Sequence, residues 1–526
     1  MDGESFSRRQ FLVGGASAVG AGGLLAACGS SGSSTSNTSS LTTSGKPKRG
    51  GTITLATSGG ASSDTLDGND TVTNPDFARA PLLYDTLVEW NADYQPYLHL
   101  AEELTSNADS SVWTIRVRKG VEFHNGKPLT IDDVLFTFQR ILSKNLTAAA
   151  VLSVMDLKNA KKLDAYTVSI PMHFPYSIMR WALTFNGQVS IVPVGYNPKE
   201  PVGTGPFKYK SFTPDETSTF TRNDNYWISG KPYVDAVVIT EYADEASQIN
   251  ALLSGEATCC DQLSFASVTP VRGGGKVANV WASPGWVPFT MRLDQAPFSD
   301  NNVRQAMRYA VDRPAYRKIV YGGYGLLGND MFGITDVEYD HALPQRAYDP
   351  EKAKFLLKQA GYDTLNVTLV TADIHTGAIE GATVLKQQAA PAGINISLDQ
   401  ITSTAFLAGY LKWTFAQDWW DGAPYLPQCG YSSVPGAPWD ETYWASSQYG
   451  PRYYSLYKQA LAQPLDGPKQ TEIVHEMMTM DYDYGGYIIP AFNPIIVGQS
   501  PSLQGVVTQK TGTPWIEYRF RDYWLA

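Results

Sequence analysis

The chain has 526 residues, which corresponds to three or four domains at a prior of about 150 residues each. Hydrophobic residues make up 43% and charged residues 17%, a globular composition that excludes a disordered chain or a coiled coil. A net charge of −10 without a basic stripe argues against a nucleic-acid binder, four cysteines exclude a disulfide scaffold, and a single apolar run at the N-terminus excludes a multi-span membrane protein.

The first 27 residues have the pattern of an export signal. Ser7-Arg8-Arg9-Gln10 precedes an uncharged, Gly- and Ala-rich run from Phe11 to Ala27. The paired arginines followed by Phe11-Leu12 resemble a twin-arginine signal, and an ordinary secretory signal with a chance arginine pair is the alternative. In both cases we expect the protein to leave the cytoplasm.

The signal ends in Leu25-Ala26-Ala27-Cys28, which resembles a bacterial lipobox. Small residues before Cys28 allow a peptidase to bind the extended chain, and the thiol can carry a diacylglycerol. Several acyl chains give stable membrane attachment. The alternative is an uncleaved chain with a buried Cys28. Residues 28–49 then form a Ser/Thr/Gly-rich tether, which cannot bury enough apolar surface to fold.

The folded body is predicted to begin near Gly50, with strands alternating with helices. Alternating apolar residues predict strands over 51–56, 113–118, 367–370 and 394–398. Helices are predicted to open after the N-cap Thr130, near Asn301 and at Pro350. This alternation indicates an α/β fold.

Four sequence blocks resemble the family 5 extracellular solute-binding proteins, the peptide- and nickel-binding subunits of ABC importers. They occur in family order and extend over most of the chain from Gly50 to Ala526. The blocks are Leu98 to Phe138, Gly203 to Trp227, Ala296 to Arg313, and Tyr348 to Tyr362.

This resemblance implies a type II periplasmic-binding fold, in which two lobes joined by a hinge close on a ligand and an extra domain is added. The expected segments are 50–85, 200–283 and 493–526 for lobe I, 86–199 for the extra domain, and 284–492 for lobe II. It also implies a monomer that delivers a solute to an ABC permease and its ATPase, without a cofactor, a metal or enzymatic activity.

The resemblance also implies where a ligand is held. In the segment from Trp413 to Tyr425, Phe415, Asp418 and Asp421 occupy positions that are aromatic or acidic in many peptide binders, and Gly422 stands where proline is common. The ligand's α-ammonium is expected to meet Asp418, with the backbone from Phe415 to Gln417 pairing an extended ligand as an added strand. A loop cap or a local arginine pair is the alternative for Asp418, and this structural interpretation is preferred for Asp421.

Aromatic residues crowd the same segment. Trp413, Trp419 and Trp420 lie within eight residues, and one or two of them are expected to face the cleft. In relatives the segment that contains Trp286 and Phe289 lines the cleft. Stacked rings suit cationic ligands and sugar faces alike, and core packing is the alternative for each ring.

A peptide is therefore the first ligand prediction and an oligosaccharide the second. The scattered histidines show no zinc-ligand spacing, and the body has neither a Gly-x-Ser-x-Gly elbow nor a phosphate-binding loop. A secreted hydrolase or a surface adhesin on the same scaffold is the alternative of another class. The pairing of Cys259, Cys260 and Cys429 stays open.

Overall fold

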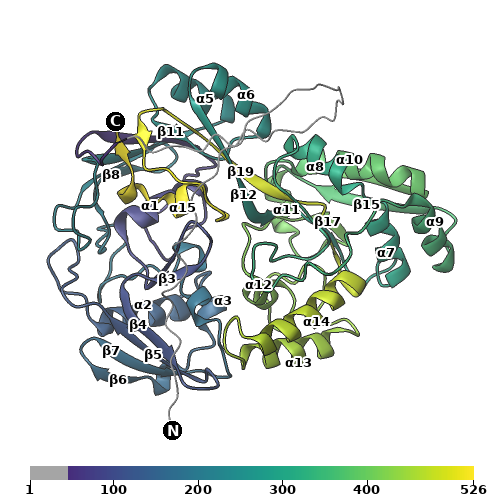
Figure 1. Ribbon diagram of the computed structural model, residues 1–526, viewed down its shortest axis with the longest axis horizontal. Helices are drawn as coiled ribbons and strands as arrows, with labels where there is room; N and C mark the ends of the chain where they lie inside the picture. Colours follow the sequence, from purple (N-terminus) through teal and green to yellow (C-terminus); the bar gives the residue numbers. More distant parts are fainter. Residues whose placement is uncertain (1–44) are drawn as a thin grey trace, which may run out of the picture. The chain divides into compact units, whose positions relative to one another are not determined.

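The computed structural model describes residues 45–526, so the predicted signal, the lipidation at Cys28 and most of the tether lie outside the described residues. The body contains two large mixed sheets and a smaller antiparallel one, with helices packed around them (Figure 1). Among the described residues, no helix is both long and apolar enough to cross a membrane.

The first large sheet collects strands from distant parts of the chain. Its central strand β1 (Thr52–Ser58) pairs in parallel with β10 (Ala236–Tyr242) and with β11 (Cys259–Cys260). The remaining strands are antiparallel to their neighbours: β8 (Phe207–Thr213), β9 (Thr217–Arg222), β12 (Val277–Trp286), β14 (Leu326–Leu327) and β19 (Ala491–Gln499). Helices α1 (Asn74–Leu83) and α5 (Glu245–Ser254) pack on β1, and α6 (Val268–Gly273) packs on β12.

The second large sheet has the order β16-β15-β17-β13-β18. Its strands are β13 (Phe289–Met291), β15 (Leu365–Thr371), β16 (Ile394–Gln400), β17 (Phe415–Gln417) and β18 (Tyr487–Ile488). Helix α10 (Ala378–Ala389) packs on β15 and β16, α8 (Arg313–Tyr321) packs on α10, and α7 (Asn301–Tyr309) packs on α9 (Pro350–Gln359). Figure 1 shows these helices grouped around β15.

Two extended segments join the large sheets. Strand β12 passes through Val287 and Pro288 into β13, and β18 passes through Ile489 and Pro490 into β19. The two segments are neighbours, because Trp286 pairs with Phe492. A pair of short connections between two α/β sheets is the geometry of a hinge between lobes, as the sequence predicts.

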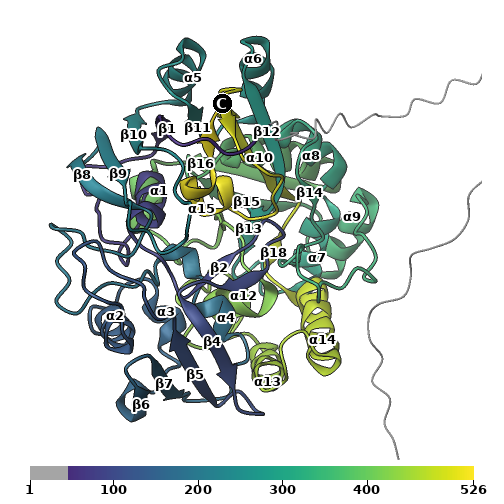
Figure 2. The same cartoon turned by 60° about the vertical axis from the view of Figure 1, so that its left-hand side comes forward.

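The smaller sheet belongs to the segment between residues 86 and 199. It is antiparallel in the order β4-β5-β7-β6, with helix α2 (Ile131–Ser143) beside it (Figure 2). The strands are β4 (Ala101–Ser106), β5 (Val112–Val117), β6 (Lys161–Asp164) and β7 (Thr167–Pro171). Two short ribbons complete the strands: β2 (Val88–Trp90) with β3 (Pro96–Leu98), and β20 (Leu503–Gln504) with β21 (Trp524–Leu525).

The remaining helices are α3 (Ala149–Leu152), α4 (Met179–Ala182), α11 (Ser403–Ala408), α12 (Tyr425–Ser432), α13 (Gly450–Leu461), α14 (Pro468–Tyr484) and α15 (Trp515–Tyr518). One hydrophobic core joins the small-sheet segment to α12, α13 and α14. Hydrogen bonds also connect the small-sheet segment to these helices. The Ser177 backbone N–H donates to Leu461 O at 3.0 Å, and Gln470 Nε2 donates to Ser177 Oγ at 3.0 Å.

The elements predicted from the sequence are confirmed within a few residues. Asp133 accepts hydrogen bonds from the Thr130 backbone N–H at 3.0 Å and from its hydroxyl at 3.1 Å, which fixes the start of α2. Strands β1, β5, β15 and β16 and helices α7 and α9 all form where predicted. The domain boundaries given by the family resemblance stay a prediction.

The three cysteines in the described part of the chain are free and buried. Cys259 and Cys260 form β11 in the first sheet, whereas Cys429 lies in α12 with its sulfur 3.1 Å from the Tyr453 hydroxyl.

Candidate functional site

A cavity of about 390 Å³ lies between three parts of the protein. They are the first large sheet with its helices (the first lobe), the segment of the smaller sheet, and the second large sheet with its helices (the second lobe). This volume falls within the range of roughly 300–1,000 Å³ that is typical of small-molecule sites. Its walls come from three stretches of the chain. The lining residues are Thr71, Val72 and Phe77; Trp90, Tyr94, Thr147, Trp181, Thr184, Phe185 and Gln188; and Leu407, Tyr410, Asp418–Pro424, Pro427, Gln428, Tyr431 and Trp439.

The loop after β17 enters this cavity because it is tied to the hinge. Trp286 and Trp420 exchange two backbone hydrogen bonds, at 2.9 and 3.0 Å, and their rings stack with centroids 5.9 Å apart. The loop then turns at Gly422, where φ is +91° and an added Cβ would lie 2.5 Å from the Pro284 carbonyl carbon. Proline cannot adopt this backbone angle, which explains why glycine stands at this position.

Asp418 is a buried carboxylate on the cavity wall. Its side chain accepts hydrogen bonds from the Tyr410 hydroxyl at 2.8 Å and from the Trp419 backbone N–H at 2.8 Å. Burial raises the pKa of Asp418 above its usual value, although these hydrogen bonds oppose the rise. Among the described residues no arginine or lysine pairs with Asp418, so the predicted alternative of a local arginine pair is not found.

Glu441 forms a second carboxyl group behind Asp418. The Tyr410 hydroxyl lies 3.2 Å from Glu441 Oε1, and the Tyr487 hydroxyl donates to Glu441 Oε2 at 2.6 Å. Burial and the neighbouring Asp418 raise the pKa of Glu441 well above its usual value. The Tyr410 hydroxyl has one proton, so it can donate to only one of the two carboxyl groups at a time: to Asp418 at 2.8 Å or to Glu441 at 3.2 Å.

Asp421 faces open space instead of a structural partner. It lines the large cavity and also an adjoining cavity of about 70 Å³. Its side chain is exposed to this space, and no hydrogen bond or ion pair ties it to another described residue. The protein around the Asp421 carboxyl group keeps water away from it, and this desolvation raises the pKa of Asp421. The charge of His375 opposes the rise. The structural role preferred for Asp421 from the sequence is therefore wrong.

Ten of the residues that line the cavity carry aromatic rings. Trp90 stacks on Tyr94 with centroids 4.3 Å apart and lies 4.6 Å from the ring of Trp181. On the opposite lobe Trp420 meets Trp439 edge to face at 5.9 Å. Flat faces on two sides of a cavity suit ligands with apolar faces or with cationic groups.

The structure divides the predicted site residues into two groups. Asp418, Trp419 and Trp420 line the large cavity, and Trp286 supports Trp420 from behind. Phe289 and Phe415 lie in the core of the second lobe, and Trp413 packs in a small cluster near Phe406.

Gln417 is also removed from the cavity, because it holds two strands together. Its side chain bonds to Thr371 Oγ1 at 2.5 Å and to Ala378 O at 2.9 Å. The expectation that an extended ligand pairs with Phe415–Gln417 is wrong, because both edges of β17 are occupied by β13 and β15. In the described structure, the large cavity is not lined by four of the predicted site residues: Phe289, Trp413, Phe415 and Gln417.

Sequence reasoning missed the half of the wall contributed by the small-sheet segment. Trp90, Tyr94, Trp181 and Gln188 are separated from Asp418 by more than two hundred positions. Glu441 was missed as well, and the only available signal was an acidic residue next to a cluster of aromatic ones.

An unusual turn borders the adjoining cavity. The four residues of α15, Trp515 to Tyr518, all have positive φ between 47° and 59°, which makes one turn of left-handed helix. Each such residue costs about 1–2 kcal/mol, and backbone strain of this kind is concentrated at functional sites. The turn carries Glu517 to the cavity wall, and burial raises the pKa of Glu517 to about 8.

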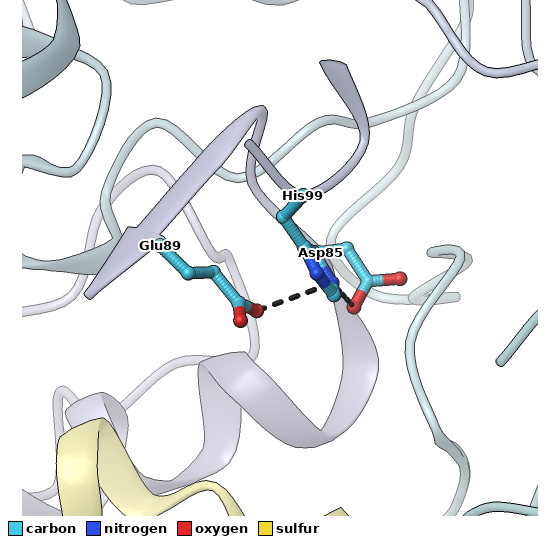
Figure 3. Close-up of side chains that lie close together, drawn as sticks. All are labelled: Asp85, Glu89 and His99. Atoms are coloured by element: carbon cyan, nitrogen blue, oxygen red, sulfur yellow. Dashed lines mark hydrogen bonds and ion pairs between the residues drawn. The ribbon is translucent and has the colours of Figure 1, made fainter. Parts of the chain in front are cut away.

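Asp85, Glu89 and His99 lie close enough together to resemble a metal site (Figure 3). His99 Nε2 is 2.9 Å from Asp85 and 3.2 Å from Glu89. Asp85 also accepts hydrogen bonds from Tyr226, Trp227 and Thr204, and Glu89 accepts from Tyr97 and Arg521. Burial opposes the ionisation of Asp85, but His99 and Arg521 outweigh it and hold the pKa of Asp85 below its usual value.

Protein donors thus already occupy both carboxylates of this cluster. The cluster connects the first lobe to the start of the small-sheet segment and to the C-terminal segment, and we assign it a structural role.

A matched pair of glycines tests the role of the turn at Gly422. Gly436 has a similar φ of +86°, but no atom of the described residues lies within 4 Å of a Cβ added there. We expect Gly422→Ala to lower the free energy of unfolding by about 1–3 kcal/mol more than Gly436→Ala, because only Gly422 also meets the Pro284 backbone. Chemical denaturation measures the difference, and equal losses in the two variants would contradict the close packing of this loop.

Two α/β lobes, a double connection between them and an aromatic cavity that both lobes line define a type II two-lobed binding protein. The family model described as "Bacterial extracellular solute-binding proteins, family 5 Middle" matches residues 95–437. This match covers more than half of the chain, and the chain belongs to this family. The fold class predicted from the sequence is confirmed.

Individual relatives differ in what their names say they bind. The glutathione-binding protein GsiB of Pectobacterium atrosepticum is 26% identical over 347 residues, covering 64% of this chain and 66% of GsiB. The heme-binding protein A of Haemophilus influenzae is 30% identical over 321 residues, covering 54% of this chain and 57% of that protein. The alignments therefore span less than two thirds of these relatives.

Solved structures match over nearly the whole chain. DppA of Helicobacter pylori in complex with the peptide STSA has a TM-score of 0.74 at 22% identity, covering 91% of this chain and 98% of DppA. NikA of Brucella suis in complex with Fe(III)-EDTA has a TM-score of 0.78 at 19% identity, covering 90% of this chain and 100% of NikA. At these identities the likeness shows the fold.

Proposed function

We propose that this protein is the solute-binding subunit of an ABC importer, anchored outside the cell membrane through a lipidated Cys28. It captures a solute in the 390 Å³ cavity and delivers it unchanged to a permease and its ATPase. The observation that carries the proposal is a ligand-sized cavity lined by two lobes that are joined by two short connections. Ligand binding between such lobes favours the closed state.

Within this function, Asp418 is the group that binds an ammonium of the ligand. A buried carboxylate without a cationic partner is costly, and an ammonium offsets that cost. A short peptide is the first candidate, supported by Asp418 and by the fold shared with the peptide-bound DppA. An oligosaccharide is the second candidate, because rings from both lobes offer stacking faces to sugars.

A binding role is favoured over the alternative of a secreted hydrolase. In the described structure, neither histidine nor cysteine lines the large cavity, so no nucleophile stands beside a histidine base there. A surface adhesin would require a large exposed apolar patch as its docking surface, whereas Trp90, Trp181, Trp420 and Trp439 line an internal cavity.

The test is to measure binding and closure together. The purified mature chain is titrated with a peptide library and with oligosaccharides by calorimetry, and X-ray scattering is recorded with and without the ligand that binds. We expect either peptides or oligosaccharides to bind and the radius of gyration to decrease on binding. Mass spectrometry should recover the bound ligand unchanged. Conversion of the bound compound over hours would overturn the binding role in favour of an enzyme.

A further inference from the structure

The walls of the large cavity are acidic and lack a cation. Asp418 and Asp421 both line it, whereas its described lining residues include no lysine, arginine or histidine. A ligand carboxylate inside this cavity would therefore be desolvated beside two acidic groups without an ionic partner. Such burial of an unpaired charge is strongly unfavourable.

The adjoining cavity does not supply the missing cation. Arg519 and Arg521 reach its wall, but both are engaged: Arg521 pairs with Glu89 through both of its terminal nitrogens, and Arg519 Nη2 donates to Trp90 O at 2.6 Å. Asp421 and Glu517 add two carboxyl groups to the same wall without a hydrogen bond to any described side chain. A carboxylate that entered this space would find acidic groups and no cation that is free to pair with it.

Several side chains that line the large cavity carry a buried polar atom without a hydrogen-bond partner among the described residues. Gln188 is 2% exposed; its Nε2 donates to Thr71 O at 2.7 Å, and its Oε1 has no partner among the described residues. Thr71 Oγ1 and Gln428 Oε1 are likewise buried and unpartnered, and Trp420 Nε1 is an unpartnered donor. An unsatisfied buried polar group costs about 1–3 kcal/mol. These atoms have almost no accessible surface, but their side chains line the cavity, so a small rotation on ligand binding would let hydroxyl, amine or amide groups of the ligand pair with them.

The aromatic faces add a third requirement. Trp90 and Trp181 on one side and Trp420 and Trp439 on the other offer stacking surfaces for apolar ring faces and for cationic groups. The ligand therefore combines a positive charge, several hydrogen-bonding groups and an apolar face.

We propose that the cavity selects a protonated amine that is rich in hydroxyl or amide groups and places no carboxylate inside it. Amino sugars and peptide amides share this chemistry. The inference rests on the proposed solute-binding function and deepens it, since an ordinary free peptide carries both an ammonium and a carboxylate. Asp421 is the second carboxylate that sets this preference, beyond the ammonium site at Asp418.

The test compares matched probes by calorimetry at pH 7. One pair is a tripeptide amide with its free acid, and the other is the glucosamine disaccharide with its N-acetylated form. We expect the amide to bind at least about tenfold more tightly than the acid, or the glucosamine disaccharide at least about tenfold more tightly than its acetylated form. The pair in which this occurs identifies the source of the amine.

The variant Asp421→Asn tests the named residue. We expect this variant to bind the amine probe about tenfold more weakly. The difference in affinity between the two members of the probe pair should also decrease. Asp363→Asn, an exposed aspartate outside both cavities, is the matched control and is expected to leave binding unchanged.

The outcomes separate this inference from the function on which it rests. If the free acid binds as tightly as the amide, the selection against carboxylates is wrong while solute binding stands. If none of the four probes binds while another library compound does, the proposal of an amine ligand is wrong, and solute binding still stands. If no compound binds and no closure occurs, the solute-binding function itself fails.

Discussion

Replacing Asp330 with Asn is expected to lower the free energy of unfolding by about 3–5 kcal/mol. Asp330 is the only carboxylate among the ion pairs of three buried arginines in the described part of the second lobe. Arg313 Nη2 donates to both of its oxygens at 2.7 and 2.6 Å, and Arg346 Nε donates at 3.0 Å. Arg308 lies 3.9 Å away, so one substitution leaves three buried guanidinium groups without their counter-charge.

Asparagine is the suitable probe because it keeps the shape of the side chain and tolerates the local backbone. Asp330 has φ of +66°, in the left-handed region that asparagine adopts more readily than most residues. The loss measured by chemical denaturation therefore reports on charge. Asp294→Asn is the control, because the pair that Asp294 forms with Arg292 is partly exposed and worth about 0–1 kcal/mol.

The same site predicts a pH dependence of stability. Burial opposes the ionisation of Asp330, but Arg313, Arg308 and Arg346 outweigh it and hold the pKa of Asp330 below its usual value of 3.8. The unfolded chain then binds this proton more readily than the folded one, so the contribution of Asp330 is present above pH 4 and is lost as the pH falls below it. A loss in Asp330→Asn no greater than in Asp294→Asn at pH 7 would contradict this account.

Local patterns in the sequence predicted local structure well. The N-cap at Thr130, the proline at the start of α9 and the alternation in β15 and β16 depend on neighbouring residues and were found where expected. The loop from Asp418 to Trp420, which the family resemblance indicated as part of the ligand site, lines the large cavity, and its role in ligand binding stays a prediction.

What sequence could not supply was the pairing of distant segments. The short apolar run Phe415–Gln417 suits an edge strand and a central strand equally, and only the sheet order shows that β13 and β15 occupy both of its edges. Likewise, nothing in the local sequence of Trp90 or Trp181 distinguishes a core tryptophan from one on a cavity wall. Asp421 was misjudged because a missing partner is a property of the folded chain.

The second large effect is expected at Asp418. Asp418→Asn should weaken the binding of the amine ligand by about 2–5 kcal/mol, or roughly 30-fold to several thousand-fold, since it removes the buried counter-charge of the ammonium. Asparagine preserves the side-chain shape and can still accept the hydrogen bond from Tyr410, so the cavity keeps its form. Calorimetry gives the affinity, and a thermal midpoint of the ligand-free protein that does not fall shows that the fold is intact.

The variant Glu441→Gln distinguishes the contribution of Glu441 from that of Asp418, its neighbour across the Tyr410 hydroxyl. Because burial and Asp418 raise the pKa of Glu441, the folded ligand-free protein binds a proton that the unfolded chain releases above its usual pKa of 4.5. The contribution of Glu441 to stability therefore falls as the pH rises above 4.5 toward its raised pKa in the folded protein, by up to about 1.4 kcal/mol per pH unit. In Glu441→Gln this slope should decrease, while the bond to Tyr487 is retained.

Ligand binding should change the protonation of the same pair. A cation beside Asp418 favours the ionised forms of both carboxyl groups, so binding releases protons and affinity for an amine rises with pH until the amine itself deprotonates. Calorimetry in two buffers of different ionisation enthalpy measures this release. We expect a smaller release in Glu441→Gln with the ammonium site kept, whereas Asp418→Asn loses affinity at every pH; equal behaviour of the two variants would mean that the ammonium is bound elsewhere.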